Sequence, residues 1–249
     1  MGYREQAPPV ALEPWLDCTW ERRAEDAAPQ RVLPDGCIDI VWIEAGGTRL
    51  VGPSTSAFLV PLPPGTRVAG ARLHPGAAAS LLGVAPEAIR DAALPIEAVW
   101  GDEGARLAAA LDEHADPAAA LRGALLVRAA AAERPDPLVA EVVTRLRRPD
   151  AAVGRLAREL AISERQLRRR VSVAVGYGPK LLLRVLRLGR ALAAARDGDE
   201  LARVAYDAGY ADQSHFSNDC RTLAGASPSV VIAPSRPISP SVPSPHRPS

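Results

Sequence analysis

The stretch VGRLARELAISERQLRRRV (residues 153–171) predicts two short helices joined by a tight turn. The apolar residues of its first part are spaced so that they share one face of a helix. Residues 161–162 form the connection, and Ser163 is a good N-cap because its hydroxyl can accept a hydrogen bond from the backbone of the next helix. Leu167 and Val171 then form the inner face of that helix. This is the pattern of a helix-turn-helix, in which a short helix braces a second one that enters the major groove of DNA.

The outer face of the second helix carries Arg165, Arg168 and Arg169. Their spacing clusters the three side chains on one side of the helix. A guanidinium group can donate two parallel hydrogen bonds to guanine, and it can also clamp a phosphate. An ordinary solvated basic helix is the alternative. The position of the charges opposite Leu167 favours the DNA-binding interpretation.

A second stretch, LARVAYDAGYADQSHFSNDCRTLAG (residues 201–225), follows the same plan. Residues 208–210 make its turn, and Asp212 is expected to cap the helix that follows. The inner face of that helix is predicted to hold Phe216, Cys220 and Leu223. The outward-facing candidates for DNA contact are Gln213, Ser214, Ser217, Asn218 and Arg221.

Between these stretches lies PKLLLRVLRLGRALAAARDG (residues 179–198). Pro179 suits a first helical turn, and Gly198 suits a C-terminal cap. A helix of about 17 residues spans roughly 25 Å at 1.5 Å per residue. Successive major-groove faces on one side of DNA lie about 34 Å apart. We therefore interpret this helix as the brace between two DNA-reading units.

The first part of the chain is predicted to be β-rich. Turn residues at 34–36, 46–47 and 63–65 separate short apolar runs, and they predict three hairpins and a small antiparallel barrel or sandwich. The runs are WLDCTW (15–20), RVL (31–33), CIDIVWI (37–43), TRLVG (48–52), FLVPL (58–62) and RVAGARL (67–73). Short helices are expected at 76–83, 86–92, about 102–113 and from Pro117 to about 132.

The predicted fold class is α+β, with a β-rich N-terminal domain that is followed in the sequence by an all-α domain of two helix-turn-helix units. The expected domains are a sensor or dimerisation domain at 1–132, a hinge at 133–137, the DNA-binding domain at 138–232 and a disordered tail rich in Pro and Ser at 233–249.

Composition and charge narrow the class of protein. Hydrophobic residues make up 47% of the chain and charged residues 24%, as in soluble globular proteins. No apolar run approaches the roughly 18 residues of a membrane span. The start MGYREQAPPV lacks the pattern of a secretion signal, so a cytoplasmic protein without a membrane partner is expected. The net charge is −6 over 1–132 and +7 over 133–249, which suggests that the second part meets a polyanion.

Enzymatic and metal sites receive little support. Cys18, Cys37 and Cys220 lie far apart, and no His/Cys cluster has zinc spacing. A hydrolytic or metal site built from His74 with Asp35, Asp39, Arg72 and Cys37 stays open, but its spacing matches no nucleophile or metal motif. Cys37 and His74 are interpreted as buried or structural. No catalytic residue, metal or cofactor is therefore predicted.

At this point the sequence resembles the DNA-binding domain of the AraC/XylS family of transcriptional regulators, over about residues 150–231. The matching residues are LARELAIS-x-RQL-x-R (156–169), Gly176-x-x-Pro179, RVLRLGRA (184–191), AYDAGYADQSHFS (205–217) and G-x-S-P (225–228). The resemblance implies sequence-specific binding of double-stranded DNA. It also implies that Arg165, Arg168 and Arg169 face bases in the first unit, and that Gln213, Ser214 and Asn218 do so in the second.

Some residues depart from the family pattern. Val171 and Cys220 stand where the family usually has phenylalanine, and Ala224 is also small, so buried volume is lost. Asn218 often corresponds to a basic residue in the family, and Asp219 adds a negative charge. The first unit is therefore expected to contribute more affinity than the second. For His215, a packing or phosphate role is favoured over base reading.

The N-terminal half resembles, at 31–42, 51–83 and 93–101, a domain often found ahead of such units in bacterial regulators. The wider family places an effector-sensing and often dimerising domain there. The resemblance thus implies a small-molecule effector and a homodimer as candidate partners, with the effector acting through the 133–137 hinge. A scaffold or protein-interaction module that kept the fold but lost DNA binding is the alternative function.

Overall fold

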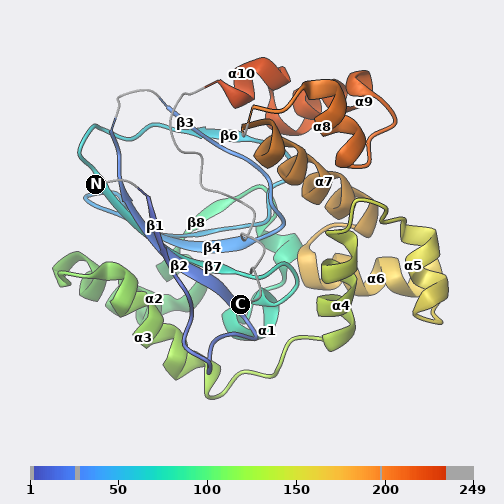
Figure 1. The fold of residues 1–249 in the computed structure, drawn as a ribbon. Coiled ribbons are helices and arrows are strands. Elements are labelled where there is room, and N and C mark those ends of the chain that lie inside the picture. Colours follow the sequence, from blue (N-terminus) through green and yellow to red (C-terminus); the bar gives the residue numbers. More distant parts are fainter. Residues whose placement is uncertain (1–2, 26–28, 197, 234–249) are drawn as a thin grey trace.

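A computed structural model describes residues 3–25, 29–196 and 198–233 (Figure 1). It combines an N-terminal sheet domain with a C-terminal array of helices, which confirms the α+β class. The disordered tail predicted at 233–249 lies outside the described residues except for Ala233.

The N-terminal part is built on a six-stranded sheet whose strand order is β1-β2-β7-β4-β5-β8, with every pairing antiparallel. The strands are β1 (Arg4–Gln6), β2 (Leu16–Arg23), β4 (Ile38–Ile43), β5 (Gly47–Val51), β7 (Arg67–Leu73) and β8 (Ala93–Pro95). Alternation along β4 buries Ile38, Ile40 and Trp42 on one face, while Asp39 faces the other way. The two faces of the sheet therefore have different chemistry.

Helices cover the first of these faces, where α2 (Ile96–Glu113) and α3 (Pro117–Ala129) lie against the sheet (Figure 1). Two shorter elements, α1 (Ala78–Leu82) and the 3₁₀ helix η1 (Pro86–Ile89), join the same hydrophobic core. The predicted helices here are confirmed, but α2 begins at Ile96 rather than near 102 and is broken at Gly101. Strands β1 and β8 were not predicted, because each is three residues long and neither carries a β-branched or aromatic residue.

The opposite face is covered by a two-stranded sheet of β3 (Gln30–Val32) and β6 (Phe58–Val60). This layer corrects two of the three predicted hairpins. Only the turn at Gly46-Gly47 joins paired strands, since β3 pairs with β6, and β7 pairs with β2 and β4. The turn residues at 34–36 reverse the chain as predicted: Gly36 has a φ of 85°, and the Asp35 carboxylate accepts a hydrogen bond from the Cys37 N–H. A turn specifies a change of direction, but the strand that follows chooses its partner by packing.

The helical part follows. It consists of α4 (Pro137–Leu146), α5 (Val153–Glu159), α6 (Glu164–Val175), α7 (Pro179–Arg196), α8 (Leu201–Asp207), α9 (Gln213–Asp219), the π-helical turn η2 (Cys220–Ala224) and α10 (Pro228–Ile232). One core joins α4, α5 and α6 to the start of α7, and a second joins the rest of α7 to α8, α9, η2 and α10. The long α7 thus links two helix-turn-helix units, as predicted.

The sheet domain contacts both helical units. At the first unit, the Arg90 guanidinium donates to the Gly176 carbonyl at 3.0 Å. At the second, the Arg31 guanidinium donates to the Ala224 carbonyl at 2.7 Å, and the Ala57 N–H donates to the Leu223 carbonyl at 2.7 Å. The β3–β6 layer therefore bridges the sheet domain and the second unit.

Candidate nucleic-acid interface and interlayer cavity

The turn between α5 and α6 is stabilised by local hydrogen bonds. Ser163 is the N-cap of α6, and it forms a reciprocal capping box with Gln166. Ala161, just before it, adopts a left-handed φ of 51°. Leu167 and Val171 are fully buried beneath the helix. The inner face of α6 is therefore packed in the core of the first unit, and its outer face is left to solvent.

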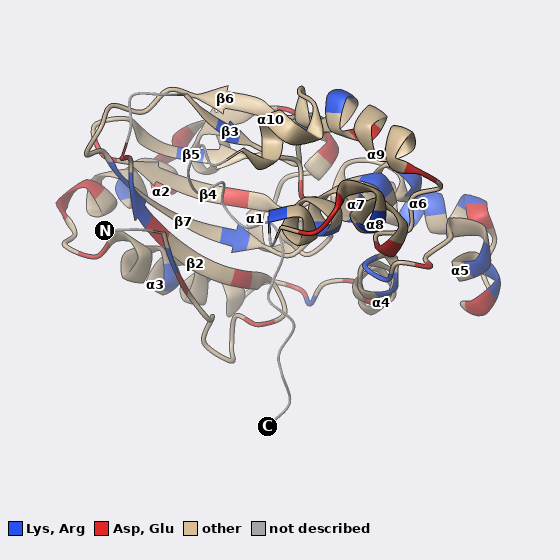
Figure 2. Cartoon of the chain, turned by 45° about the horizontal axis from the view of Figure 1, so that its top comes forward, with Lys and Arg blue, Asp and Glu red and all other residues tan. Residues whose placement is uncertain are grey.

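Three arginines occupy that outer face. Arg165, Arg168 and Arg169 are all exposed, and within the described parts of the chain none of their side chains forms an ion pair or a hydrogen bond. Arg170 differs, since it pairs with Asp136 at 3.3 Å. Basic residues gather on α5, α6 and α7 (Figure 2). The three guanidinium groups are thus available to an external acceptor.

The second unit has the same construction. Asp212 caps α9 by accepting a hydrogen bond from the His215 N–H at 2.7 Å, and Gly209 in the turn has a φ of 85°. Phe216, Cys220 and Leu223 are buried, as predicted. Gln213, Ser214, Asn218 and Arg221 are exposed, and Ser217 is half-buried. The rings of His215 and Tyr210 pack in a T-shaped arrangement with their centroids 5.1 Å apart.

Asp219 requires a correction. The sequence suggested that it adds a negative charge to the second recognition helix and so weakens the contribution of the second unit to affinity. The structure instead buries it, with 3% of the residue exposed, and pairs it with Arg184 of α7 at 2.7 Å. The reason is the helix position: Asp219 lies three residues after Phe216 and shares its inner face. The remaining ground for a weaker second unit is Asn218, together with the hydrogen bond that Arg221 donates to it at 3.2 Å.

The small residues that stand where the family pattern has larger ones all lie in cores. Val171, Cys220 and Ala224 are each fully buried. Burial raises the pKa of the Cys220 thiol to about 12, so it stays protonated near neutrality and acts as a packing side chain. Cys220–Ala224 is π-helical, and the carbonyls of Leu223 and Ala224 accept hydrogen bonds from the sheet domain.

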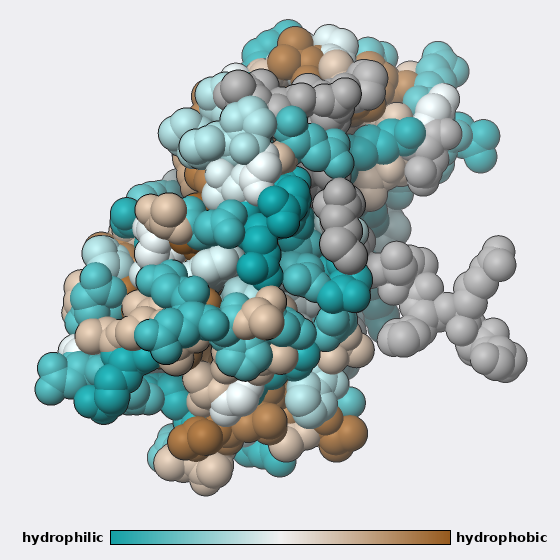
Figure 3. Space-filling model, turned by 90° about the vertical axis from the view of Figure 1, so that its left-hand side faces the viewer, coloured by the Kyte–Doolittle hydropathy of each residue, from teal (hydrophilic) through white to brown (hydrophobic). Residues whose placement is uncertain are grey.

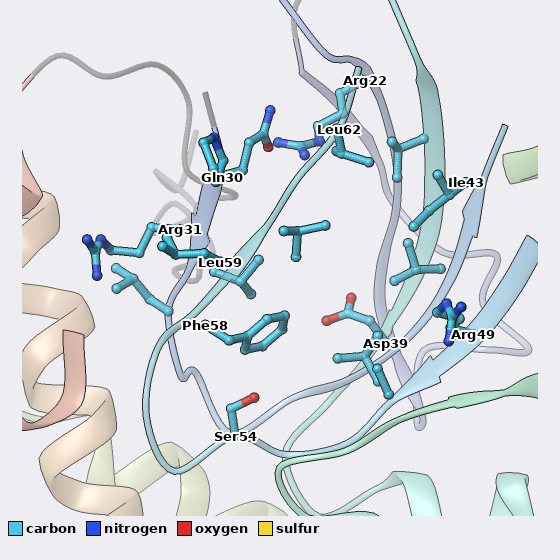
Figure 4. A pocket seen from close by; sticks show the side chains of 18 of the residues that line it. Arg22, Gln30, Arg31, Asp39, Ile43, Arg49, Ser54, Phe58, Leu59 and Leu62 are labelled. Atoms are coloured by element: carbon cyan, nitrogen blue, oxygen red, sulfur yellow. The ribbon is translucent and has the colours of Figure 1, made fainter. Parts of the chain in front are cut away.

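A cavity of about 490 Å³ lies between the main sheet and the β3–β6 layer (Figure 4). Its lining comes from both layers and from α10, which contributes Val230 and Val231. Sequence reasoning did not find it. A cavity between two layers has no local signal, because its walls come from segments whose pairing is long-range.

A charged cluster forms one side of this cavity. Arg72 of β7 is paired in register with Asp39 of β4, and its Nε lies 3.3 Å from Asp39 Oδ1 and 3.6 Å from Asp35 Oδ2. Trp20 Nε1 donates to Asp39 Oδ1 at 3.2 Å. Burial raises the pKa of Asp39 to about 6 although Arg72 acts in the opposite direction, and the two carboxylates hold the pKa of Arg72 above its usual value. The sequence placed these residues in one domain, but only the strand register brings them together.

His74 does not join this cluster. It lies 3.6 Å from Asp17, and burial lowers its pKa. Cys37 is buried beside the charged cluster, and burial raises the pKa of its thiol. Across the described residues, no group of three or more His, Cys, Asp or Glu side chains is placed to hold a metal ion.

The described part of the chain contains no helix that is both long and apolar enough to cross a membrane. The face on the side of the N-terminal strands is largely hydrophilic, with hydrophobic side chains gathered at its upper and lower margins (Figure 3).

Two family models match the chain. Residues 156–233 match a family described as a helix-turn-helix domain, and residues 4–95 match a domain of unknown function, DUF6597. No curated protein matches.

Several solved structures are similar. ToxT from Vibrio cholerae is 13% identical with a TM-score of 0.46, over 93% of this chain and 98% of that one. The C-terminal domain of AraT, a response regulator from Geobacillus stearothermophilus, is 20% identical with a TM-score of 0.38, over 45% and 96%. A probable AraC family transcriptional regulator from Rhodopseudomonas palustris CGA009 is 24% identical with a TM-score of 0.34, over 40% and 94%.

The capped turns, the two separate cores and the matched residues agree on one architecture. The chain carries a helix-turn-helix domain at residues 156–233, which follows a domain of unknown function at residues 4–95.

Proposed function

We propose that this protein is a sequence-specific DNA-binding transcriptional regulator whose activity responds to a small-molecule effector. The observation that carries the DNA-binding part is the set of three exposed arginines on α6. They stand on a helix whose start is capped and whose inner face is buried, so the fold holds all three on one outer face in the absence of DNA. Arginine at such positions reads guanine and binds phosphate.

In this proposal, the two units read adjacent major grooves with different chemistry. Arg165, Arg168 and Arg169 of the first unit supply charge and bidentate donors. The second unit presents neutral polar groups, Gln213, Ser214, Ser217 and Asn218, with Arg221 toward the backbone. The first unit therefore contributes more affinity, and the second contributes mainly discrimination.

Selection of bound sequences from a random duplex pool tests this function. With full-length protein at fixed salt, we expect enrichment of two short motifs about one helical turn apart. Affinity for the enriched site should fall steeply as salt rises, because each phosphate contact releases counterions. No enrichment and no salt-dependent affinity would instead favour the scaffold function.

The effector part rests on the position of the cavity. Its lining includes Val230 and Val231 of α10, so a bound molecule would touch the helical part directly. Its outer layer also packs on the second unit, since Leu33 and Ala57, at the ends of β3 and β6, join that unit's core. We infer that occupancy of the cavity changes how the β3–β6 layer holds the second unit. The energetic requirement is a difference in ligand affinity between the two arrangements.

The Arg31→Ala variant tests this bridge without a ligand. Loss of the charged hydrogen bond to Ala224 should loosen the contact, so the Ala57 amide, which donates to Leu223, should exchange with solvent roughly tenfold faster. Hydrogen exchange measured by mass spectrometry or NMR reports this. Arg23→Ala is the matched control, since Arg23 also lines the cavity but bonds to Gly65 within the sheet domain. Equal protection of Ala57 in all three proteins would show that this bridge does not hold the second unit.

A further inference from the structure

We propose that the interlayer cavity binds a molecule with an apolar body and one protonated amino group, and that the amino group pairs with Asp39. This ligand class rests on the proposed effector function, and it deepens that function by naming the chemistry of the effector.

The apolar body follows from the walls. Val41, Ile43, Phe58, Leu62 and Val68 line the cavity from both layers. A volume of about 490 Å³ lies in the range of roughly 300–1,000 Å³ that small-molecule sites occupy. Burying apolar ligand surface against such walls stabilises the complex.

The amino group follows from an imbalance of charge. One guanidinium, that of Arg72, serves three carboxylates, those of Asp35, Asp39 and, at 3.8 Å, Glu5. Asp39 Oδ1 already accepts from Trp20 and faces Arg72, and the carboxylate of Asp39 points into the cavity (Figure 4). A negative charge that is held away from water and only partly compensated favours a cation beside it. An ammonium group supplies that charge and a donor for the second oxygen of Asp39.

The other arginines that line the cavity do not reverse this sign at Asp39. Arg31 and Arg23 donate to backbone carbonyls, those of Ala224 and Gly65. Arg22 also lines the cavity, but it lies away from Asp39 (Figure 4). Arg49 is exposed, where solvent screens its charge. The end of the cavity around Asp39 therefore keeps its acidic character, whereas another part of the lining carries Arg22, whose buried Nε has no hydrogen-bond partner among the described residues.

The titration of Asp39 gives a second way to test the charge of the ligand. Its pKa, raised to about 6 by burial, means that Asp39 is ionised at pH 7.5 and protonated at pH 5. The groups that face it are Arg72 of β7, Asp35 from the turn before β4, and Trp20 and Asp17 of β2. An amine needs the carboxylate, so its affinity should fall as the pH drops through 6. An anionic ligand would show no such loss.

Three probes with the same chain and different heads test the ligand class: n-octylamine, 1-octanol and octanoate. Binding to the full-length protein is measured without DNA, by the shift of the melting temperature and by calorimetry at pH 7.5. Octylamine is expected to bind most tightly, and Asp39→Asn should weaken it by about 30-fold or more, because truncating one partner of a buried charge pair is costly. The matched control is Asp112→Asn, since Asp112 accepts from Trp42 Nε1 on the other face of the sheet.

Val41→Phe provides an independent readout, because it fills the cavity while keeping Asp39; it should reduce binding of octylamine and octanol alike. If octanoate binds more tightly than octylamine, the proposal that the ligand carries an amino group is wrong. The effector function would still stand if octanoate then altered the affinity of the protein for DNA. Octylamine affinity that is unchanged in Asp39→Asn would also overturn the proposal. If no probe binds at all, the ligand class is wrong, whereas enrichment of DNA sites would still stand as a separate result.

Discussion

The Phe216→Ala variant is expected to lose about 3–5 kcal/mol of unfolding free energy, the usual cost of removing a buried aromatic ring. Phe216 has no exposed surface, and its ring lies 5.4 Å from that of Tyr210 in the core of the second unit. Its neighbours come from α7, α8, η2 and α10, so the gap cannot be closed by moving one side chain. Urea unfolding followed by circular dichroism measures the loss.

The matched control is Phe58→Ala, which changes the one other phenylalanine of the chain. Phe58 is half-buried and borders the interlayer cavity, so its removal enlarges a space that already exists. Its loss should be clearly smaller. A loss below about 1 kcal/mol in Phe216→Ala would mean that the second unit adds little to the cooperative stability of the chain.

The second large effect concerns base reading. Arg168→Ala and Arg169→Ala should each weaken binding to the enriched DNA site by about 1–3 kcal/mol and relax its sequence preference. Asn218→Ala should cost less, because its side chain is neutral and already accepts from Arg221. Affinities for the enriched site and for a scrambled duplex, measured at one salt concentration, separate reading of bases from attraction to phosphate.

Arg170→Ala is the control for charge, since it removes one arginine of the same helix whose guanidinium is paired with Asp136. Arg170→Ala should weaken binding to the enriched site and to the scrambled duplex slightly and by the same factor. If Arg168→Ala and Arg169→Ala behave in the same way as this control, their role is phosphate binding and the sequence is read elsewhere.

The free energy of unfolding should depend on pH because Asp39 changes its protonation state between pH 4 and 6. A carboxyl pKa that folding raises from 3.8 to about 6 means that the native state holds the proton more tightly than the unfolded chain. This group therefore favours folding below pH 4, and its contribution is lost as the pH rises from about 4 to 6. Asp39→Asn should flatten this part of the stability profile.

The amino-acid sequence by itself determined the two helix-turn-helix units. Their spacing of apolar residues, the caps at Ser163 and Asp212 and the turn at Gly209 act over a few residues, so they can be interpreted without knowing the rest of the fold. The buried positions of Leu167, Val171 and Phe216 followed from the same helical period. The family resemblance added the expectation of which outer residues face DNA.

Tertiary structure alone decided the remainder. The pairing of β3 with β6, the approach of Arg72 to Asp39 and the burial of Asp219 against Arg184 join residues between 26 and 35 positions apart. Turn residues and hydrophobic periodicity predict which face of an element a residue occupies, but they do not predict which distant segment packs against that face. The cavity is the clearest example of a feature that the sequence does not predict. Its walls come from two sheets and from α10, so no single segment of the sequence indicates it.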